Sequence, residues 1–158
     1  MLETPSEEDS IFFSRSDVDE PLSSYSEYGF ELEGVFWPSV EHYFQGMKFE
    51  NEDYRQRVRS AGHPKQAAKL GGTRFKRARR DWSKLQLVVM TRAVYTKCRT
   101  HPEVASRLLA TGDKKLVENS QYDYFWGCGR DRRGHNNYGK VLMDVRNRLR
   151  EEAASLTD

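Results

Sequence analysis

Apolar residues recur at strand spacing near the beginning of the chain and at helical spacing further on. Residues 11–13 form a short apolar run typical of a strand. The alternation of Phe30 and Leu32, a turn at Gly34 and the apolar residues 35–37 predict a hairpin. The later periodic segments predict helices. We therefore expect a mainly α (α+β) fold, a compact helical domain with a small β element at its amino end.

Proline and glycine mark the expected ends of two helices, because proline suits the first helical turn and glycine suits the position after the last. The bracketing pairs are Pro64 with Gly71 and Pro102 with Gly112. Residues 138–156 repeat an apolar stripe and predict the last helix. Between these lies a segment with Asp81 as its expected N-cap and apolar residues on more than one face, which predicts a central, largely buried helix.

The segment that begins after Ser39, an expected N-cap, carries two stripes at helical spacing. Treated as one helix, its apolar stripe is Val40, Tyr43, Phe44, Met47, Asn51, Tyr54 and Val58, and its polar stripe is Glu41, Gln45, Lys48 and Glu52. Helix physics alone favours a polar stripe of surface residues without a chemical role: Glu41 would suit the helix dipole and Lys48 would be solvated. On the same view His42 would be a structural histidine. On that interpretation Glu41→Gln would cost at most about 1 kcal/mol, as expected for an exposed site. A catalytic role is the sharper alternative.

Length and charge restrict the possibilities further. The chain has 158 residues and a formal net charge of +2, and we expect residues 1–10 to be a mobile tail and residues 11–158 a single domain. No apolar stretch reaches the roughly 20 residues of a membrane span, and the polar amino terminus does not resemble a secretory signal, so a cytoplasmic protein is expected. Cys98 and Cys128 form no CxxC motif, so neither a metal site nor a disulfide framework is predicted.

Two segments look suited to a ligand. Residues 118–139 lack periodicity but are rich in glycine and aromatic residues, which favours a ligand-facing loop. There Gly127 and Gly129 would allow close backbone approach, and Trp126 would form a pocket wall. The basic run at residues 74–80 is either a solvated face or a phosphate clamp, with Arg74 and Arg79 as the candidate contacts.

These features together resemble one family. "FWPSVEHYFQGMKF" (residues 36–49), Trp82 and "DYFWGCGRDRRGHNNYGKVLMDVR" (residues 123–146) are similar to the YbiA-like N-glycosidases, also called the NADAR family, over roughly residues 11–150. The resemblance implies hydrolysis of bonds between ribose C1 and nitrogen, by a compact, mainly α-helical protein that requires no metal or other cofactor. The functional residues carried over from the family are Glu41, Lys48, Trp82, Asp123 and Asn136.

Cleavage of a ribosyl C1–N bond passes through an oxocarbenium-like transition state, which calls for a stabilising carboxylate and a proton-transferring group. We assign proton transfer to Glu41 and water activation or charge stabilisation to Asp123, and the reverse assignment stays open. As a cation, Lys48 would bind phosphate or tune Glu41; as a neutral amine, it would attack C1 and form a Schiff base. Trp82 is about equally suited to core packing and to stacking on the base.

The resemblance leaves the substrate open. The first expectation is a phosphoribosylamino pyrimidine intermediate of riboflavin biosynthesis, which hydrolysis would split with release of ribose 5-phosphate. The alternative is removal of ADP-ribose from guanine, for which the change from an acidic residue to Cys128 in "WGCG" leaves room. A third possibility is a non-catalytic nucleotide or RNA binding module that uses the basic run. In the first two cases the partner is a small ribosylated base, and no membrane or protein partner is expected.

Overall fold

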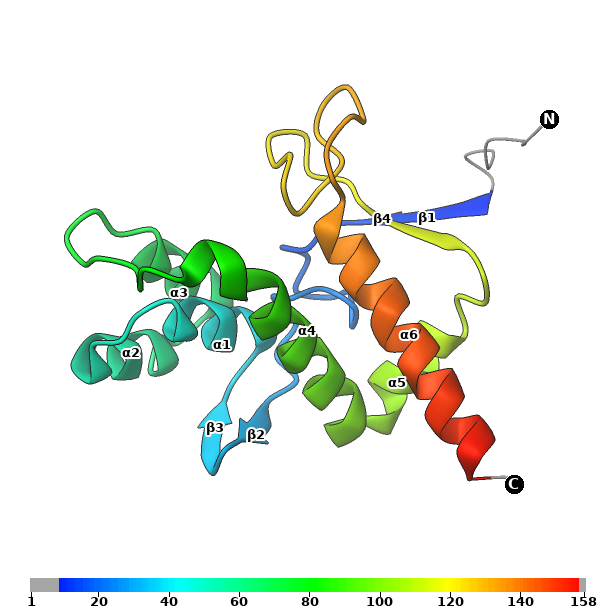
Figure 1. Cartoon of the computed structure of the whole chain (residues 1–158), viewed down its shortest axis with the longest axis horizontal. Helices are drawn as coiled ribbons and strands as arrows, with labels where there is room; N and C mark the ends of the chain where they lie inside the picture. The colour runs from blue at the N-terminus through cyan, green and yellow to red at the C-terminus, as the bar shows by residue number, and fades with distance from the viewer. Residues whose placement is uncertain (1–8, 157–158) are drawn as a thin grey trace.

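The structure, a computed structural model, describes residues 9–156 (Figure 1). Helices dominate and every strand is short, which confirms the expected mainly α (α+β) fold. In chain order the elements are β1 (Ser10–Phe13), β2 (Phe30–Leu32), β3 (Val35–Trp37), α1 (Val40–Met47), α2 (Glu52–Arg59), α3 (Pro64–Gly71), α4 (Trp82–Thr100), α5 (Pro102–Leu109), β4 (Lys115–Glu118) and α6 (Asn137–Ser155). Residues 1–8 of the expected mobile tail lie outside the described residues, and Ser10 already belongs to β1.

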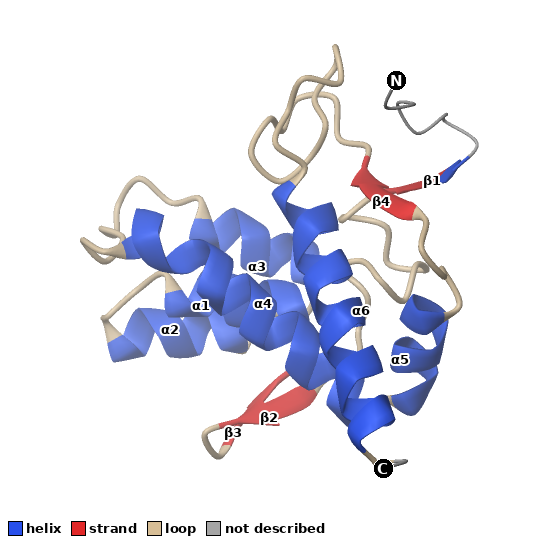
Figure 2. Ribbon diagram, turned by 45° about the vertical axis from the view of Figure 1, so that its right-hand side comes forward, coloured by secondary structure: helices blue, strands red, loops and turns tan. Residues whose placement is uncertain are grey.

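The helices form one body in which α4 and α6 cross side by side (Figures 1 and 2). Helices α1, α2 and α3 lie together at one end, and α5 packs against both α4 and α6. The β1–β4 pair lies beside the first turns of α6, while the β2–β3 hairpin projects from the opposite side. No helix within residues 9–156 is both long and apolar enough to cross a membrane.

The first strand pairs with a strand that the sequence did not predict. β1 and β4 run parallel, with Ser10 opposite Lys115 and Phe13 opposite Glu118. The sequence of β4, "KLVE", is too short to show alternation, and its partner lies about 100 residues earlier in the chain. This pairing sets the segment after β1 beside the loop after β4, so it determines the geometry of the candidate site.

The predicted hairpin is confirmed. β2 and β3 are antiparallel, with Phe30 opposite Trp37, and both of these side chains are buried. The turn consists of Glu33 and Gly34 at φ 52° and φ 78°, the two positive values that the tightest hairpin turns require.

The prediction of one helix through residue 58 is wrong. Helix α1 ends at Met47. Asn51, which we placed in the apolar stripe, is instead the N-cap of α2, and its side chain accepts a hydrogen bond from the Tyr54 amide at 2.9 Å. In the intervening turn Phe49 is buried, and its ring lies 4.7 Å from that of Tyr54. An N-cap and a small second core therefore outweigh the continuous periodicity.

The N-cap of α1 is confirmed and accounts for His42. The Ser39 hydroxyl accepts from the His42 amide at 3.1 Å and also lies 2.7 Å from Nδ1 of the same ring. Nε2 lies 2.9 Å from the carbonyl of Ala61, which can only accept, so Nε2 carries the proton. Burial lowers the pKa of His42. Both ring nitrogens are used, and the expectation of a structural histidine agrees with these contacts.

Other predicted helix ends agree in part. Helix α3 runs from Pro64 to Gly71 as expected, but α5 ends at Leu109, before the predicted end at Gly112. Asp81 precedes α4 yet makes no capping hydrogen bond, because its carboxylate pairs with Arg79 at 2.6 Å. Helix α4 is also less buried than predicted, because Leu87 and Val88 are exposed.

Candidate active site

Glu41 lies in the first turn of α1 and is completely buried. Its carboxylate accepts from Nη1 of Arg15 at 2.6 Å, from the Ser24 hydroxyl at 2.9 Å and from Nε2 of Gln45 at 2.8 Å. Both carboxylate oxygens are thus held, by two donors from the segment between β1 and β2 and by one from α1 itself. The interpretation of Glu41 as exposed decoration is wrong, because α1 is covered by α2, α3, α4 and the segment after β1.

Arg15 is one of two charged residues of this site that the sequence did not indicate. It follows β1, and its guanidinium reaches both candidate catalytic carboxylates: Nη1 contacts Glu41, and Nη2 lies 4.0 Å from Oδ2 of Asp123. Burial opposes its charge, but the neighbouring Glu41, Tyr25 and Asp123 raise the pKa of Arg15 above its ordinary value. One cation therefore joins two carboxylates that are 82 residues apart in the sequence.

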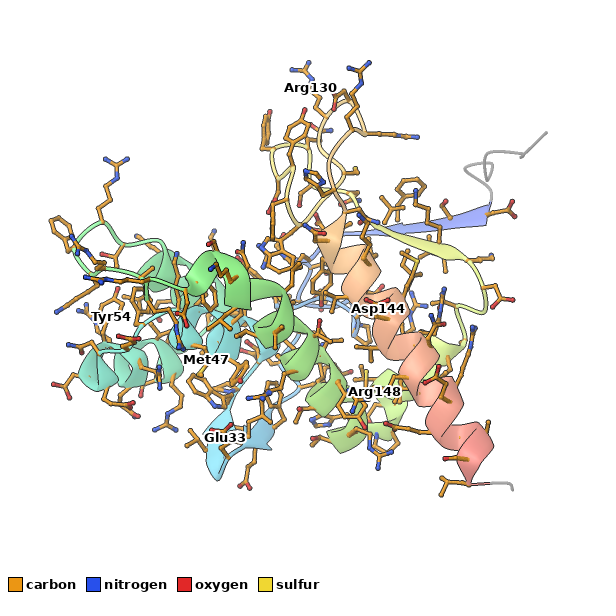
Figure 3. The ribbon with its side chains drawn as sticks, in the orientation of Figure 1. Glu33, Met47, Tyr54, Arg130, Asp144 and Arg148 are labelled. Atoms are coloured by element: carbon orange, nitrogen blue, oxygen red, sulfur yellow. The ribbon has the colours of Figure 1, made fainter. Side chains whose placement is uncertain are left out.

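Asp123 lies in the loop after β4, and its two oxygens have different surroundings. Oδ1 accepts from the amides of Phe125 at 3.0 Å and Trp126 at 2.8 Å, whereas Oδ2 faces Arg15. Its side chain is 32% exposed and lines an open hollow of about 640 Å³ formed by residues 120–125. The loop rises above the first turn of α6, with Arg130 at its outer end (Figure 3). Asp123 is therefore the carboxylate that solvent or a ligand can reach.

A third carboxylate, that of Glu118, holds the backbone around this arrangement in place. Glu118, at the end of β4, is completely buried and accepts from the Arg15 amide at 3.0 Å. It also accepts from the amide and the hydroxyl of Ser120, at 3.2 and 2.6 Å. Glu118 thus joins the backbone of the Arg15 segment to the loop that carries Asp123, and no sequence motif pointed to it.

The loop glycines have a structural reason that needs no ligand. A side chain at Gly127 would bring its Cβ to 2.3 Å from Oε2 of Glu118. Gly129 has φ 71°, and a Cβ there would lie 2.4 Å from the Tyr124 ring. Their predicted role in ligand approach stays a prediction.

Asn136 also serves the loop. It has φ 51°, its Nδ2 donates to the Leu116 carbonyl at 2.9 Å, and its Oδ1 accepts from the Glu118 amide at 2.8 Å. These bonds anchor the start of α6 to β4. The side chain is buried and both of its polar atoms have partners within the protein, so its predicted substrate contact has no direct support in the geometry.

Lys48 lies at the end of α1 beside the end of α3. Its Nζ donates to the Gly71 carbonyl at 2.8 Å, and burial lowers the pKa of the amine. Gln45 packs closely on Gly71: a Cβ added to Gly71 would lie 1.9 Å from Oε1 of Gln45. Since the same Gln45 amide donates to Glu41, Lys48 and Glu41 are connected through Gly71 and Gln45.

The two candidate tryptophans both lie close to the Phe44 ring. The Trp82 ring is 5.0 Å and the Trp126 ring 5.3 Å from the Phe44 ring. Trp126 is only 6% exposed and belongs to the core, whereas Trp82 is half-buried. Of the two, Trp82 therefore keeps more surface for a ligand, and the pocket-wall role of Trp126 stays a prediction.

The structure does not join the basic run to this site through side chains. Arg79 pairs with Asp81, and only its backbone amide reaches Lys48, donating to the carbonyl at 2.9 Å. Arg74 is exposed in the same loop, and within residues 9–156 no hydrogen bond or ion pair links it to Glu41 or Asp123. The described residues also contain no group of three or more His, Cys, Asp or Glu side chains arranged to hold a metal ion.

Known proteins are similar to this chain in sequence and in fold. The NADAR domain family matches residues 4–150. N-glycosidase YbiA of Escherichia coli (strain K12) is 38% identical over 138 residues, which cover 87% of this chain and 86% of that protein. A riboflavin biosynthesis protein of Vibrio vulnificus (strain YJ016) is 36% identical over 147 residues, which cover 92% of this chain but 40% of that protein.

The similarity extends to three dimensions. The NMR structure of the E. coli protein YbiA matches with a TM-score of 0.83 at 37% identity, covering 92% of this chain and 87% of that chain. Together with the family match over residues 4–150, this likeness identifies the chain as a member of the NADAR domain family.

Proposed function

We propose that this chain is an N-glycosidase that hydrolyses the bond between ribose C1 and nitrogen in phosphoribosylamino pyrimidines, with release of ribose 5-phosphate. The reaction class is supported by a relative that is itself named an N-glycosidase and is similar over most of both chains. The substrate is supported by the relative named a riboflavin biosynthesis protein. The observation that carries the proposal is the Glu41–Arg15–Asp123 arrangement, in which a buried and an accessible carboxylate share one guanidinium.

The different surroundings of the two carboxylates support different roles. Glu41 is buried and held by three donors, which suits a fixed charge that stabilises the oxocarbenium-like transition state. Asp123 borders the open hollow and has Oδ2 directed toward Arg15, which suits activation of a water molecule. In this scheme the hydroxide of water adds to C1 while the C1–N bond breaks, and the proton of that water ends on the leaving nitrogen. Asp123 thus keeps the water activation that we assigned to it from the sequence, whereas the role proposed for Glu41 changes from proton transfer to charge stabilisation.

Lys48 has two proposed roles that one experiment separates. Its lowered pKa would favour an amine that attacks C1 and forms a Schiff base, whereas its hydrogen bond to Gly71 favours a role in holding Gln45 and the end of α3. Borohydride added during turnover would trap an imine as a stable adduct on Lys48, detected as an added mass on the intact protein. Turnover without any adduct would leave the positioning role.

A substrate comparison tests the function directly. Purified protein is incubated with 5-amino-6-(5-phosphoribosylamino)uracil and, separately, with ADP-ribosylated guanosine, and release of the base is followed by chromatography. We expect release from the phosphoribosylamino pyrimidine. Release from ADP-ribosylated guanosine alone would favour the alternative substrate. If neither compound is cleaved, the proposed activity is wrong.

Two aspartates on the same loop provide a matched pair of variants. We expect Asp123→Asn to lower kcat by about a hundredfold or more, the usual contribution of a general base, with little loss of stability because the amide oxygen can still accept the two backbone bonds. Asp131→Asn is the control, since its carboxylate accepts from the Arg133 amide in a similar turn but is exposed. Equal activity of the two variants would contradict the role of Asp123.

A further inference from the structure

The basic charge of this chain is concentrated in one segment that the proposed reaction leaves unexplained. Residues 54–80 contain ten Lys and Arg and no Asp or Glu, whereas the rest of the chain has sixteen Lys and Arg against all twenty-four Asp and Glu. We refer to residues 54–80 as the basic segment. It forms most of α2, all of α3 and the loop toward α4, which lie together at one end of the molecule (Figure 1). A chain of nearly neutral net charge therefore has one strongly basic end.

The basic segment surrounds a hollow of about 500 Å³. Cations from three elements line it: Arg57 from α2, Lys69 from α3 and Lys76 from the loop. All three side chains are exposed, and within the described part of the chain none has a carboxylate at ion-pair distance. The free charges of this hollow are therefore available to an anionic ligand.

The hollow also offers aromatic surface. Phe75 borders it and is 95% exposed, the most exposed of the large apolar side chains within residues 9–156. Tyr54, labelled in Figure 3, also lines the hollow and donates its hydroxyl to the Leu70 carbonyl at 2.5 Å. The Lys76 ammonium lies 6.0 Å from the centre of the Tyr54 ring. A fully exposed ring among unpaired cations is the combination that binds a stacked base together with its phosphates.

We propose that this hollow is a binding site for single-stranded nucleic acid, with backbone phosphates on the Lys and Arg side chains of α2, α3 and the loop, and one unpaired base on Phe75. A single phosphate would not need cations from three elements, and a base within a duplex could not expose its face to Phe75. The site is distinct from the Glu41–Asp123 site and does not rest on the proposed hydrolysis. The basic segment meets the candidate active site at Lys48, whose amine donates to the Gly71 carbonyl and whose own carbonyl accepts from the Arg79 amide.

The test measures binding of fluorescently labelled 12-nucleotide oligo(U), oligo(dT) and a 12-base-pair DNA duplex by anisotropy between 50 and 300 mM KCl. We expect the single strands to bind more tightly than the duplex. Phe75→Ala should weaken single-strand binding by about tenfold without changing the salt dependence, because stacking carries no charge. Lys69→Ala combined with Lys76→Ala should lower the slope of log K against log salt concentration by about 1.4, or about 0.7 for each lost phosphate contact.

Matched controls separate a site from diffuse attraction. Lys114→Ala combined with Lys115→Ala removes the same charge from exposed positions at the start of β4, on the other side of the molecule, and should leave binding unchanged (Figure 1). Asp123→Asn should also bind normally, which separates this inference from the proposed reaction. Equal loss in both double variants, duplex binding as tight as single-strand binding, or no binding at 50 mM KCl would each overturn the proposal. Competition with anionic vesicles is a further test. If the vesicles displace the strands completely and bind through Lys69, Phe75 and Lys76, the surface binds membranes and the proposal is overturned as well.

Discussion

Arg15 determines whether the two carboxylates of the candidate site act together. Its guanidinium contacts Glu41 at 2.6 Å through Nη1 and faces Asp123 at 4.0 Å through Nη2. A lysine ammonium is a single point charge and can serve only one of them. We therefore expect Arg15→Lys to lower kcat by tenfold or more while KM changes less, and we expect Arg15→Ala to lose about 3 kcal/mol or more of unfolding free energy, because Glu41 would be buried without a cation.

Steady-state kinetics and urea unfolding of the two variants check this expectation. Arg107→Lys is the matched control, because Arg107 pairs with Glu20 at 3.3 Å outside the site. A purely structural Arg15 would show the opposite pattern, with Arg15→Lys as active as the unmodified protein. The same burial changes our expectation for Glu41→Gln: its three donors make a loss of stability well above the 1 kcal/mol of an exposed site the expected result.

At the scale of elements, α1 and α3 are in close contact at Gln45 and Gly71. Substitutions at this contact test whether Gln45 positions Glu41. Alanine at Gly71 would place its Cβ 1.9 Å from Oε1 and 2.9 Å from Cβ of Gln45, so Gln45 must move away from Glu41. Alanine at Gly72 would meet only carbonyl oxygens at 3.6 Å or more. We expect Gly71→Ala to lower kcat/KM about tenfold and Gly72→Ala to leave it unchanged, with thermal unfolding measured for both. Similar activity of the two variants would exclude a role for this contact.

The sequence predicted elements where the signal is local. Ser39 begins α1, Pro64 begins α3 and the Glu33–Gly34 turn closes the hairpin, because caps and turns depend on residues a few positions apart. The split between α1 and α2 was missed although its cap, Asn51, is also local, because an amide at helical spacing was taken for part of the apolar stripe. β4 was missed for another reason: its pairing with β1 is a long-range contact that leaves no periodicity in four residues.

At the scale of the whole molecule, the site shows the same difference between local sequence signals and long-range contacts. Family likeness pointed to Glu41, Lys48 and Asp123, which lie in or beside recognisable motifs. Arg15 and Glu118 lie in polar or short segments without a pattern, and they meet only because β1 and β4 pair in parallel. The site is therefore a product of tertiary structure: the β1 segment supplies the cation, α1 the buried carboxylate, and the loop after β4 the accessible one.

A buried lysine outside the site makes the stability of the whole molecule depend on pH. Lys97 is 2% exposed, and its amine donates to the Ser23 carbonyl at 2.9 Å and the Ser26 hydroxyl at 2.7 Å. Burial lowers its pKa from 10.5 to about 7, although the nearby Cys98 and Glu20 oppose the shift. Between these two pKa values the unfolded chain holds a proton that the folded protein has lost, so stability rises with pH through this group.

The expected contribution is an increase of about 2 kcal/mol in unfolding free energy between pH 7 and 9, obtained from about 1.4 kcal/mol per pH unit for one proton. The interval stops at pH 9 because burial raises the pKa of Cys98 from 9.0 to about 11, which makes stability fall with pH above that point. The pKa of His42 is lowered from 6.5, so this group changes stability only below pH 7.

Urea unfolding at pH 7, 8 and 9 of the unmodified protein and of Lys97→Met measures the effect, because methionine has a similar length and no proton to lose. The difference in unfolding free energy between the two proteins should rise in favour of the unmodified protein across the series, and a difference that stays constant would show that Lys97 keeps its proton in the folded state.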